Sequence, residues 1–247
     1  PELFRQHSPL RTVAEYRLFP LEHIDDLGRL IEQCRPRGLN VTTPYKEAVL
    51  SYFEALELSP EVARLGAANV LSLDYDNVGL VRCRAYNTDV YGFAESLRGV
   101  LLGACPRAII LGTGGAARAV ALGLESLGYS PEDYCFISRT STEPGIQVRD
   151  FIGSRGTAVL PYSSLEELVT EKAIIINASS VGINAADELA LPYEALDSRH
   201  LCYDLNYRQS STAFLVRCAQ SGARCIDGSS MLRLQAEASW HIWGARL

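Results

Sequence analysis

Short runs of apolar, often β-branched residues alternate along this chain with longer stretches whose apolar positions recur at helical spacing. That alternation is typical of a parallel β-sheet covered by helices, and it predicts an α/β fold class. A polar pair, Asp76 and Asn77, predicts a hairpin turn between two of the strands. The opening residues 1–5 have the spacing of an amphipathic helix. The predicted strands are residues 14–18, 38–41, 68–74, 79–84, 108–111, 134–138, 158–161, 173–177, 201–204 and 223–227, and the predicted helices are residues 44–55, 88–99, 116–127, 165–169 and 213–221.

The length and composition indicate an ordinary globular protein. The 247 residues suffice for two modest domains, each with a buried core. Apolar residues make up 47% and charged residues 21% of the chain. The net charge of −6, without a basic stripe, argues against nucleic acid as a partner. No apolar run approaches the roughly twenty residues that span a bilayer, so no membrane segment is expected.

The cysteines are scattered, with no C-x-x-C pair and no histidine cluster beside them. This pattern predicts no metal site, and thiols inside apolar runs behave as small hydrophobic side chains. We therefore expect reduced, mostly buried thiols and a cytoplasmic protein. The cysteines are Cys34, Cys83, Cys105, Cys135, Cys202, Cys218 and Cys225.

A glycine-rich loop directly follows the apolar run at residues 107–111. Its sequence, GTGGAA at residues 112–117, leads into a helical stretch, and a second apolar run follows. Glycine lets such a turn close and lets its backbone approach a pyrophosphate, whose charge is stabilised by the free amides at the helix N-terminus. The order of strand, loop, helix and strand predicts a dinucleotide-binding unit. The alternative is a glycine turn that only serves helix packing.

The residue after the second strand discriminates between NAD and NADP. A carboxylate there would bind the ribose 2′-hydroxyl of NAD, whereas this chain has Arg139, whose guanidinium can clamp a 2′-phosphate. NADP is therefore favoured. Glu143 would repel a phosphate, and the alternative for Arg139 is a solvated side chain at a strand end.

Two further segments carry candidate chemistry. Lys46 follows a polar, proline-marked turn, and Asp89 lies near the end of a second hydrophobic unit. Together with a dinucleotide loop, a lysine and an aspartate suggest proton transfer coupled to hydride transfer. The alternatives are a solvated lysine in the first turn of a helix and a carboxylate that stabilises a helix N-terminus.

Several motifs occur together in an order that resembles the shikimate dehydrogenase family. The resemblance covers nearly everything from about residue 14 to the end of the chain. The motifs are NVTTPYKE at 40–47, GAANV at 66–70, YNTD at 86–89, GTGGA at 112–116, SRT at 138–140, NAS at 177–179, DLNY at 204–207, DG at 227–228, ML at 231–232 and QA at 235–236.

The resemblance implies reversible, NADPH-dependent reduction of 3-dehydroshikimate to shikimate, on the route to chorismate and the aromatic amino acids. Lys46 and Asp89 match the family's catalytic pair. Hydride delivery to a ketone builds negative charge on oxygen, and an ammonium held beside a carboxylate can stabilise and protonate that oxygen. Implied substrate contacts are Thr42, Asn69, Asn87, Tyr207 and Gln235. Implied cofactor contacts are Gly112, Gly114, Gly115, Ala116, Arg139, Thr140, Asn177, Ala178, Ser179, Gly228 and Met231, of which Met231 could equally be core packing.

Two features depart from the family pattern. Members usually begin with a glycine-rich strand and a Ser-x-Ser pair that binds the substrate carboxylate, and His7-Ser8-Pro9 lies too close to the strand at 14–18 to be that pair. Either this segment lies outside the sequence, or the protein binds its substrate without those serines. Glu143 stands where many relatives place a second basic residue for the 2′-phosphate.

The resemblance also implies a domain organisation. We expect residues 1–90 and 229–247 to form the substrate-binding catalytic domain, and residues 91–228 to form an NADP-binding Rossmann domain with a parallel sheet. The expected partner is a small molecule, shikimate or 3-dehydroshikimate, and the protein is expected to act as a monomer or homodimer.

Two other functions remain open at this point. A quinate/shikimate dehydrogenase would differ in its tolerance of an extra ring hydroxyl. A non-catalytic cofactor-binding or regulatory relative would fit the absent serines, but the presence of Lys46 and Asp89 argues against it. A methylene-tetrahydrofolate dehydrogenase would not call for the Asn87-Thr88-Asp89 motif.

Overall fold

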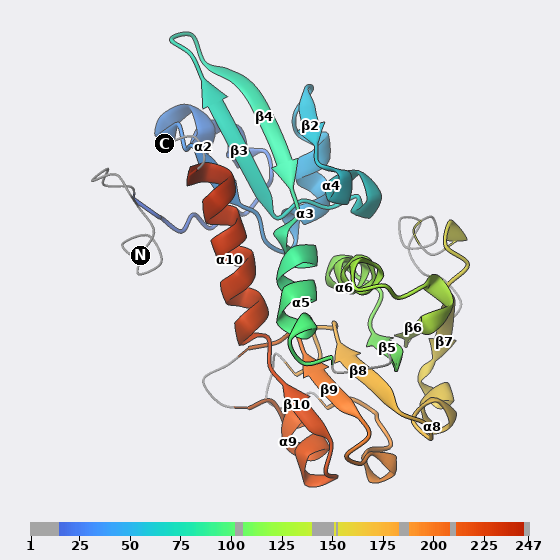
Figure 1. Cartoon of the computed structure of the whole chain (residues 1–247). Coiled ribbons are helices and arrows are strands. Elements are labelled where there is room, and N and C mark those ends of the chain that lie inside the picture. The colour runs from blue at the N-terminus through green and yellow to red at the C-terminus, as the bar shows by residue number, and fades with distance from the viewer. Residues whose placement is uncertain are drawn as a thin grey trace. The chain divides into compact units, whose positions relative to one another are not determined.

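A computed structural model describes residues 15–101, 106–139, 151, 153–182, 188–207 and 211–244 (Figure 1). The chain divides into two compact units, one formed by residues up to Thr88 together with those from Gln235 on, and the other by Asp89–Leu234. Within the described residues, the strands form a four-stranded sheet in the first unit and a six-stranded sheet in the second.

The first unit is built on a mixed sheet with strand order β1-β3-β4-β2. Strands β1 and β3 are antiparallel, β3 and β4 form the predicted hairpin, and β2 lies parallel to β4. Figure 1 shows the β3–β4 hairpin as the longest part of this sheet. Its elements are α2 (Asp26–Cys34), β1 (Gly38–Asn40), α3 (Tyr45–Ala48), the 3-10 turn η1 (Val49–Ser51), β2 (Leu56–Leu58), α4 (Pro60–Leu65), β3 (Val70–Tyr75) and β4 (Leu80–Tyr86). Helix α5 (Thr88–Arg98) begins in the first unit, and α10 (Ser229–Gly244) ends in it.

Several expectations for this unit are wrong. The described residues of the predicted strand 14–18 form no strand, and the predicted helix 44–55 is only the short α3 followed by η1. The predictions missed α2, β2 and α4. Helix α4 nevertheless has clear local signals, because the Ser59 hydroxyl accepts a hydrogen bond from Val62 N (3.4 Å), Pro60 follows, and Gly66 ends the helix in the left-handed conformation. The predicted helix at residues 1–5 lies outside the described residues.

The core of the first unit lies between the sheet and its helices. Leu71 and Leu73 of β3 pack with Leu27 and Ile31 of α2, and with Val49. On α10, the Trp243 indole donates a hydrogen bond to Leu71 O (2.9 Å). A Cβ at Gly38 would overlap the Trp243 ring, so the indole and the β1 backbone are in close contact.

The second unit contains a six-stranded sheet whose strands are all parallel, with order β10-β9-β8-β5-β6-β7. Numbered from β5, this is the doubly wound order 3-2-1-4-5-6, which places a ligand crevice between β5 and β8, where the strand order reverses. Its strands are β5 (Arg107–Leu111), β6 (Tyr134–Ser138), β7 (Ala158–Pro161), β8 (Ala173–Asn177), β9 (Leu201–Asp204) and β10 (Arg224–Ile226). Its helices and 3-10 turns are α6 (Gly115–Ser126), η2 (Pro131–Asp133), η3 (Tyr162–Ser164), α8 (Leu165–Leu168), η4 (Tyr193–Ala195) and α9 (Ala213–Gln220), with most of α5 and the start of α10.

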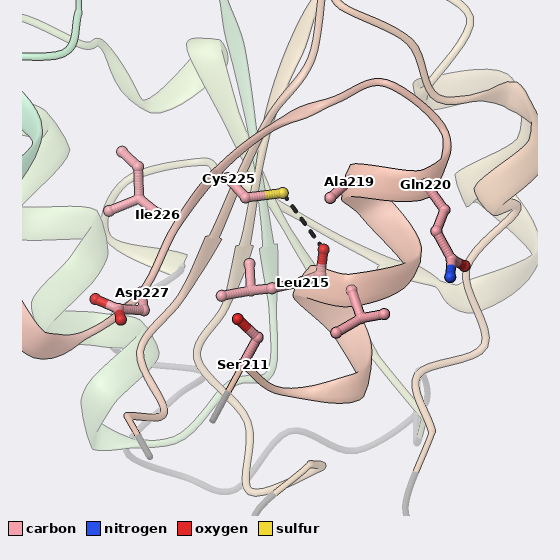
Figure 2. A pocket seen from close by; sticks show the side chains of 8 residues that line it. Ser211, Leu215, Ala219, Gln220, Cys225, Ile226 and Asp227 are labelled. Atoms are coloured by element: carbon pink, nitrogen blue, oxygen red, sulfur yellow. Dashed lines mark hydrogen bonds between the residues drawn. The ribbon is translucent and has the colours of Figure 1, made fainter. Parts of the chain in front are cut away.

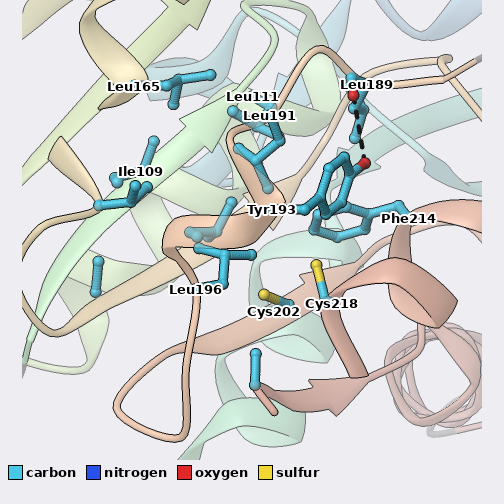
Figure 3. Packing of buried hydrophobic residues seen from close by; sticks show 14 of the residues in the cluster. Ile109, Leu111, Leu165, Leu189, Leu191, Tyr193, Leu196, Cys202, Phe214 and Cys218 are labelled. Carbon is cyan, nitrogen blue, oxygen red and sulfur yellow. Dashed lines mark hydrogen bonds between the residues drawn. The ribbon is translucent and has the colours of Figure 1, made fainter. Parts of the chain in front are cut away.

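Apolar side chains cover both faces of this sheet. On one face, alternate residues of β5, β6 and β8 pack against α8, α9 and the segment around Tyr193, and Figure 3 shows Cys202 and Cys218 inside this cluster. On the other face, Phe93 of α5 meets Tyr203 edge-on (5.4 Å between ring centroids). A Cβ at Gly123 would lie 2.6 Å from the Phe93 ring, which allows α5 and α6 to approach closely. Burial on both faces explains why these strands are continuous apolar runs.

Thiols occupy core positions in both units. Cys83 is buried in the first unit, and Cys135, Cys202 and Cys218 are buried in the second. Burial raises the pKa of the Cys83 thiol to about 12. None of the helices that the structure describes has the length and apolar character needed to span a bilayer.

Candidate active site

The segment that carries Lys46 is anchored to the neighbouring GAANV motif. Tyr45 N donates to Thr42 O (2.9 Å), and Ala68 N donates to the Lys46 carbonyl (2.8 Å). The Thr43-Pro44 peptide bond is cis. These contacts hold the half-buried Lys46 at the start of α3, next to the loop that leads into β3.

Asn69 connects three elements of the first unit. Its Oδ1 accepts a hydrogen bond from Thr88 N (2.8 Å), and its Nδ2 donates to Thr88 Oγ1 (3.1 Å) and to Gln235 Oε1 (3.2 Å). The side chain is 3% exposed. The predicted substrate contacts Asn69 and Gln235 are therefore in direct contact, although 166 positions separate them in the sequence.

The Asn87-Thr88-Asp89 motif forms the junction between β4 and α5. Asn87 Nδ2 donates to Ala67 O (3.0 Å), so it also reaches the GAANV motif. Asp89 lies in the first turn of α5 and is 8% exposed. A carboxylate in that position is stabilised by the helix dipole.

The glycine loop of the second unit lies at the point where its strand order reverses. Gly112, after β5, has a φ of 111°, and a Cβ there would lie 3.2 Å from Ala178 O, after β8. Gly114, the N-cap of α6, has nothing within 4 Å of its Cβ position. A Cβ at Gly228 would collide with the Leu205 carbonyl. The predicted cofactor residues Gly112, Ala178 and Gly228 are thus close to backbone of neighbouring strand ends.

Both ends of the Asn177 side-chain amide are hydrogen-bonded to other groups of the protein. Its Oδ1 accepts from Ser179 N (3.1 Å) and Ser179 Oγ (2.7 Å), and its Nδ2 donates to Val181 O (3.0 Å) and Asp204 Oδ1 (3.0 Å). With no exposed surface, the Asn177 side chain shapes the loop after β8, in which Ala178 is buried and Ser179 is half-buried.

Asp204 is the buried carboxylate of this network. It accepts hydrogen bonds from Thr212 Oγ1 (2.6 Å), Asn177 Nδ2 (3.0 Å) and Asn206 N (3.0 Å). Burial raises the pKa of the Asp204 carboxyl, and these hydrogen bonds oppose that rise. The network joins the ends of β8 and β9 to the start of α9.

The remaining predicted cofactor residues and Tyr207 belong to the second unit and differ in exposure. Arg139 follows β6 and is exposed, while Thr140 and Glu143 lie outside the described residues. Tyr207 is 53% exposed, and Met231 is 8% exposed. Gly115 and Ala116 open α6.

Several residues near the predicted site were missed by the sequence analysis. Thr88 and Ser239 contact each other (3.3 Å) and complete the Asn69 cluster, and Asp204 holds Asn177. Arg118 is 2% exposed, with its guanidinium 3.7 Å from the Cβ position of Gly115. An arginine in the first turn of a helix, directly after a glycine loop, was the available signal for Arg118. Thr88 is part of the motif at residues 86–89 but was assigned no role, and Ser239 gave no local signal.

A separate cavity of about 710 Å³ lies between α9 and the edge strand β10 (Figure 2). Cys225 donates a weak hydrogen bond to Leu215 O (3.5 Å) at its wall, and burial raises the pKa of this thiol to about 11. The thiol is therefore protonated at neutral pH and is a poor nucleophile. The described residues hold no group of three or more His, Cys, Asp or Glu side chains arranged to bind a metal ion.

Comparison with known proteins gives consistent matches. A family model described as the shikimate dehydrogenase substrate binding domain matches residues 5–71. The chain is 36% identical over 208 residues to the shikimate dehydrogenase (NADP(+)) of Methanocella arvoryzae, covering 83% of this chain and 72% of that protein. It is 33% identical over 236 residues to that of Maricaulis maris, covering 94% and 80%. The crystal structure of shikimate 5-dehydrogenase from Thermus thermophilus in complex with NADP(H) and shikimate superposes with a TM-score of 0.73 at 28% identity, covering 93% of this chain and 80% of that chain.

Proposed function

The chain belongs to the shikimate dehydrogenase family, and we propose that it catalyses the reversible, NADPH-dependent reduction of 3-dehydroshikimate to shikimate with Lys46 and Asp89 as its catalytic pair. The reaction converts 3-dehydroshikimate, NADPH and a proton reversibly into shikimate and NADP⁺. It is a step of the shikimate pathway, which leads to chorismate and the aromatic amino acids.

The observation that carries the residue assignment is a path of hydrogen bonds between the two motifs. Ala68 N binds the Lys46 carbonyl (2.8 Å), and the adjoining Asn69 binds Thr88 N (2.8 Å), which directly precedes Asp89. Such direct bonds restrict where each backbone can place its side chain, and this kind of fixed placement is what a catalytic pair needs.

Lys46 supplies the proton in the reductive direction. As hydride arrives at the carbonyl carbon, negative charge develops on the ketone oxygen, and the Lys46 ammonium stabilises it and transfers a proton to it. The neutral amine then regains a proton from solvent. Asp89 orients the ammonium of Lys46 through the attraction between opposite charges. In the oxidative direction, the neutral Lys46 amine accepts the hydroxyl proton.

The second unit has the features required to hold NADP, which supplies or accepts the hydride when it is bound. A side chain at Gly112 would fill the space beside Ala178, at the loop where a pyrophosphate would approach α6. The exposed Arg139 at the end of β6 can pair with a 2′-phosphate. Asn177 and Asp204 hold the loop that carries Ala178 and Ser179.

The first unit would bind the substrate. Thr42, Asn69, Asn87 and Gln235 offer hydroxyl and amide groups, which can both donate and accept hydrogen bonds. A polyhydroxylated acid needs such partners, because each hydroxyl that leaves water without one costs free energy. We assign substrate binding to residues 1–90 and 229–247, with Tyr207 as a further contact, and NADP binding to residues 91–228.

Two properties of the whole protein belong to the same proposal. We expect it to act in the cytoplasm, as its thiol-rich cores would remain reduced there. We expect a monomer or a homodimer, which light scattering coupled to size-exclusion chromatography distinguishes.

The test is nicotinamide absorbance with shikimate or quinate, each combined with NADP or NAD. We expect turnover with shikimate and NADP, and its loss in Lys46→Met and in Asp89→Asn. Lys172→Met is the matched control, because Lys46 and Lys172 are the lysines of the chain and Lys172 is exposed. Faster turnover with quinate would replace the proposed substrate, and wild-type protein that binds NADP but turns over neither acid would refute the enzyme assignment.

A further inference from the structure

Four buried or half-buried side chains form one hydrogen-bond network in the first unit. Asn69 lies just before β3, Thr88 begins α5, and Gln235 and Ser239 lie one turn apart on α10. Thr88 Oγ1 lies 3.3 Å from Ser239 Oγ, and Ser239 Oγ donates to the Gln235 carbonyl (2.8 Å). Ser239 is 1% exposed and Thr88 is 4% exposed.

A backbone amide fixes the orientation of Asn69. Thr88 N can only donate, so the Asn69 atom that lies 2.8 Å from it must be the carbonyl Oδ1. The other end of the amide is then Nδ2, which has two hydrogens to donate. They point to Thr88 Oγ1 (3.1 Å) and to Gln235 (3.2 Å).

The orientation of Gln235 follows from that of Asn69. Because Asn69 Nδ2 is a donor, the Gln235 atom facing it must be the acceptor Oε1. Gln235 Nε2 is therefore turned away from Asn69. Among the residues that the structure describes, none accepts a hydrogen bond from Gln235 Nε2.

Ser239 fixes the direction of the remaining bond. Its hydroxyl has one proton, which it donates to the Gln235 carbonyl, so toward Thr88 it can only accept. Thr88 Oγ1 donates to Ser239 and accepts from Asn69. The other acceptor within reach of the Thr88 hydroxyl, Asn69 Oδ1, is more distant (3.4 Å) and already holds Thr88 N.

We infer that Ser239 is a positioning residue. Through Thr88 and Asn69, it holds Gln235 with its amide NH2 group toward the substrate. The inference rests on the proposed function, in which Gln235 lines the substrate site. Gln235 then acts as a donor, and it favours a substrate oxygen that accepts, such as a ring hydroxyl or a carboxylate. A substrate carrying an ammonium group at that place is disfavoured, because two donors would face each other.

The first test compares steady-state constants of hydroxyl variants. We expect Ser239→Ala and Thr88→Val each to raise KM for shikimate about three- to tenfold, the range for one neutral hydrogen bond, with KM for NADP changed by less than about twofold. Thr88→Ser keeps the hydroxyl and should restore KM. Ser126→Ala is the matched control, since its hydroxyl also donates to a helix carbonyl, Gly123 O (2.7 Å), but lies in the other unit. A purely structural role would lower stability without this selective change in KM.

The second test addresses the orientation of Gln235 directly and does not depend on a buried variant folding. Gln235→Glu keeps an acceptor for Asn69 but presents a second acceptor to the substrate, whereas Gln235→Met presents neither. We expect the higher KM for shikimate in Gln235→Glu. Either of two outcomes refutes the inference and leaves the proposed function intact. One is a lower KM in Gln235→Glu than in Gln235→Met, and the other is an unchanged KM in both Ser239→Ala and Thr88→Val. Wild-type protein that fails to turn over shikimate overturns the proposed function as well.

Discussion

The carbonyl oxygen of Lys46 accepts a hydrogen bond from the amide of Ala68 at 2.8 Å. This bond joins the Lys46 carbonyl to the loop before β3. Helix α3 ends two residues after Lys46, at Ala48. The backbone of the proposed proton donor is therefore held by the same motif that contains Asn69. Lys46 is fixed by tertiary contacts rather than by a long helix.

Chemical labelling should distinguish Lys46 from Lys172. We expect shikimate with NADP to slow the reaction of Lys46 with an amine-directed reagent, because bound substrate covers the amine, and to leave Lys172 unaffected. At about ten times the dissociation constant, mass action predicts roughly tenfold protection. Peptide mass spectrometry reads both sites in one sample. Equal rates at Lys46 with and without ligands would place this lysine outside the substrate site.

Gly112→Ala and Gly114→Ala should differ in stability. Gly112 has a φ of 111°, and its new Cβ would lie 3.2 Å from Ala178 O, so we expect a loss of about 1 to 3 kcal/mol in the free energy of unfolding. Gly114 has a φ of −75° and open space around its Cβ position, so its unfolding midpoint should barely move. Urea denaturation monitored by circular dichroism measures both. A stable Gly112→Ala protein would show that the loop relaxes freely.

Arg139→Ala should weaken the preference for NADP. Loss of a charge-assisted hydrogen bond to a phosphate corresponds to about a 10- to 100-fold rise in KM for NADP, while KM for NAD should stay constant. Arg199→Ala, which removes an exposed arginine paired locally with Asp197, controls for net charge. If the NADP/NAD ratio is the same in wild type and Arg139→Ala, another residue binds the 2′-phosphate.

Asp204→Asn should change how stability depends on pH. Burial raises the pKa of the Asp204 carboxyl, so the folded protein holds this proton more tightly than the unfolded chain does. The stabilisation from the protonated form is complete below the unfolded pKa, near about 4, and is lost as pH rises through the folded pKa. Asparagine does not ionise, so the unfolding free energy of Asp204→Asn relative to wild type should increase from about pH 4 to about pH 7. Urea titrations across this pH range measure the difference in unfolding free energy between Asp204→Asn and wild type. A difference that does not change with pH would contradict the expected cost of ionising the buried Asp204 carboxyl.

The second unit was the more predictable half of the fold. Strands such as β8 are buried on both faces, so their sequences are continuous apolar runs with clear ends. The first unit gave weaker signals. Strand β2 has three residues, two of them exposed. The predicted helix 44–55 is only α3 and η1, and the bond from Ala68 N to the Lys46 carbonyl is a contact that periodicity does not report. Helix α2 was missed although Leu27, Leu30 and Ile31 have helical spacing.

The candidate site shows the same division. Motif residues such as Lys46, Asn69 and Asp89 could be named from the sequence, because their chemistry and order resemble a known family. Ser239 could not, since a serine inside a helix has the same local signal wherever its hydroxyl points. Its role depends on which residue of another segment lies opposite, and only the folded chain shows that this is Thr88.

The placement of the thiols gives each unit its own built-in reporter of opening. Cys83 is 3% exposed in the core of the first unit, and Cys202 and Cys218 have no exposed surface in the core of the second. A disulfide reagent can reach them only when the surrounding core opens, so their labelling rates measure the opening free energy of each unit separately. Binding of NADP alone should then slow the labelling of Cys202 and Cys218 more than that of Cys83. The native thiols suffice for this measurement, and no probe has to be introduced.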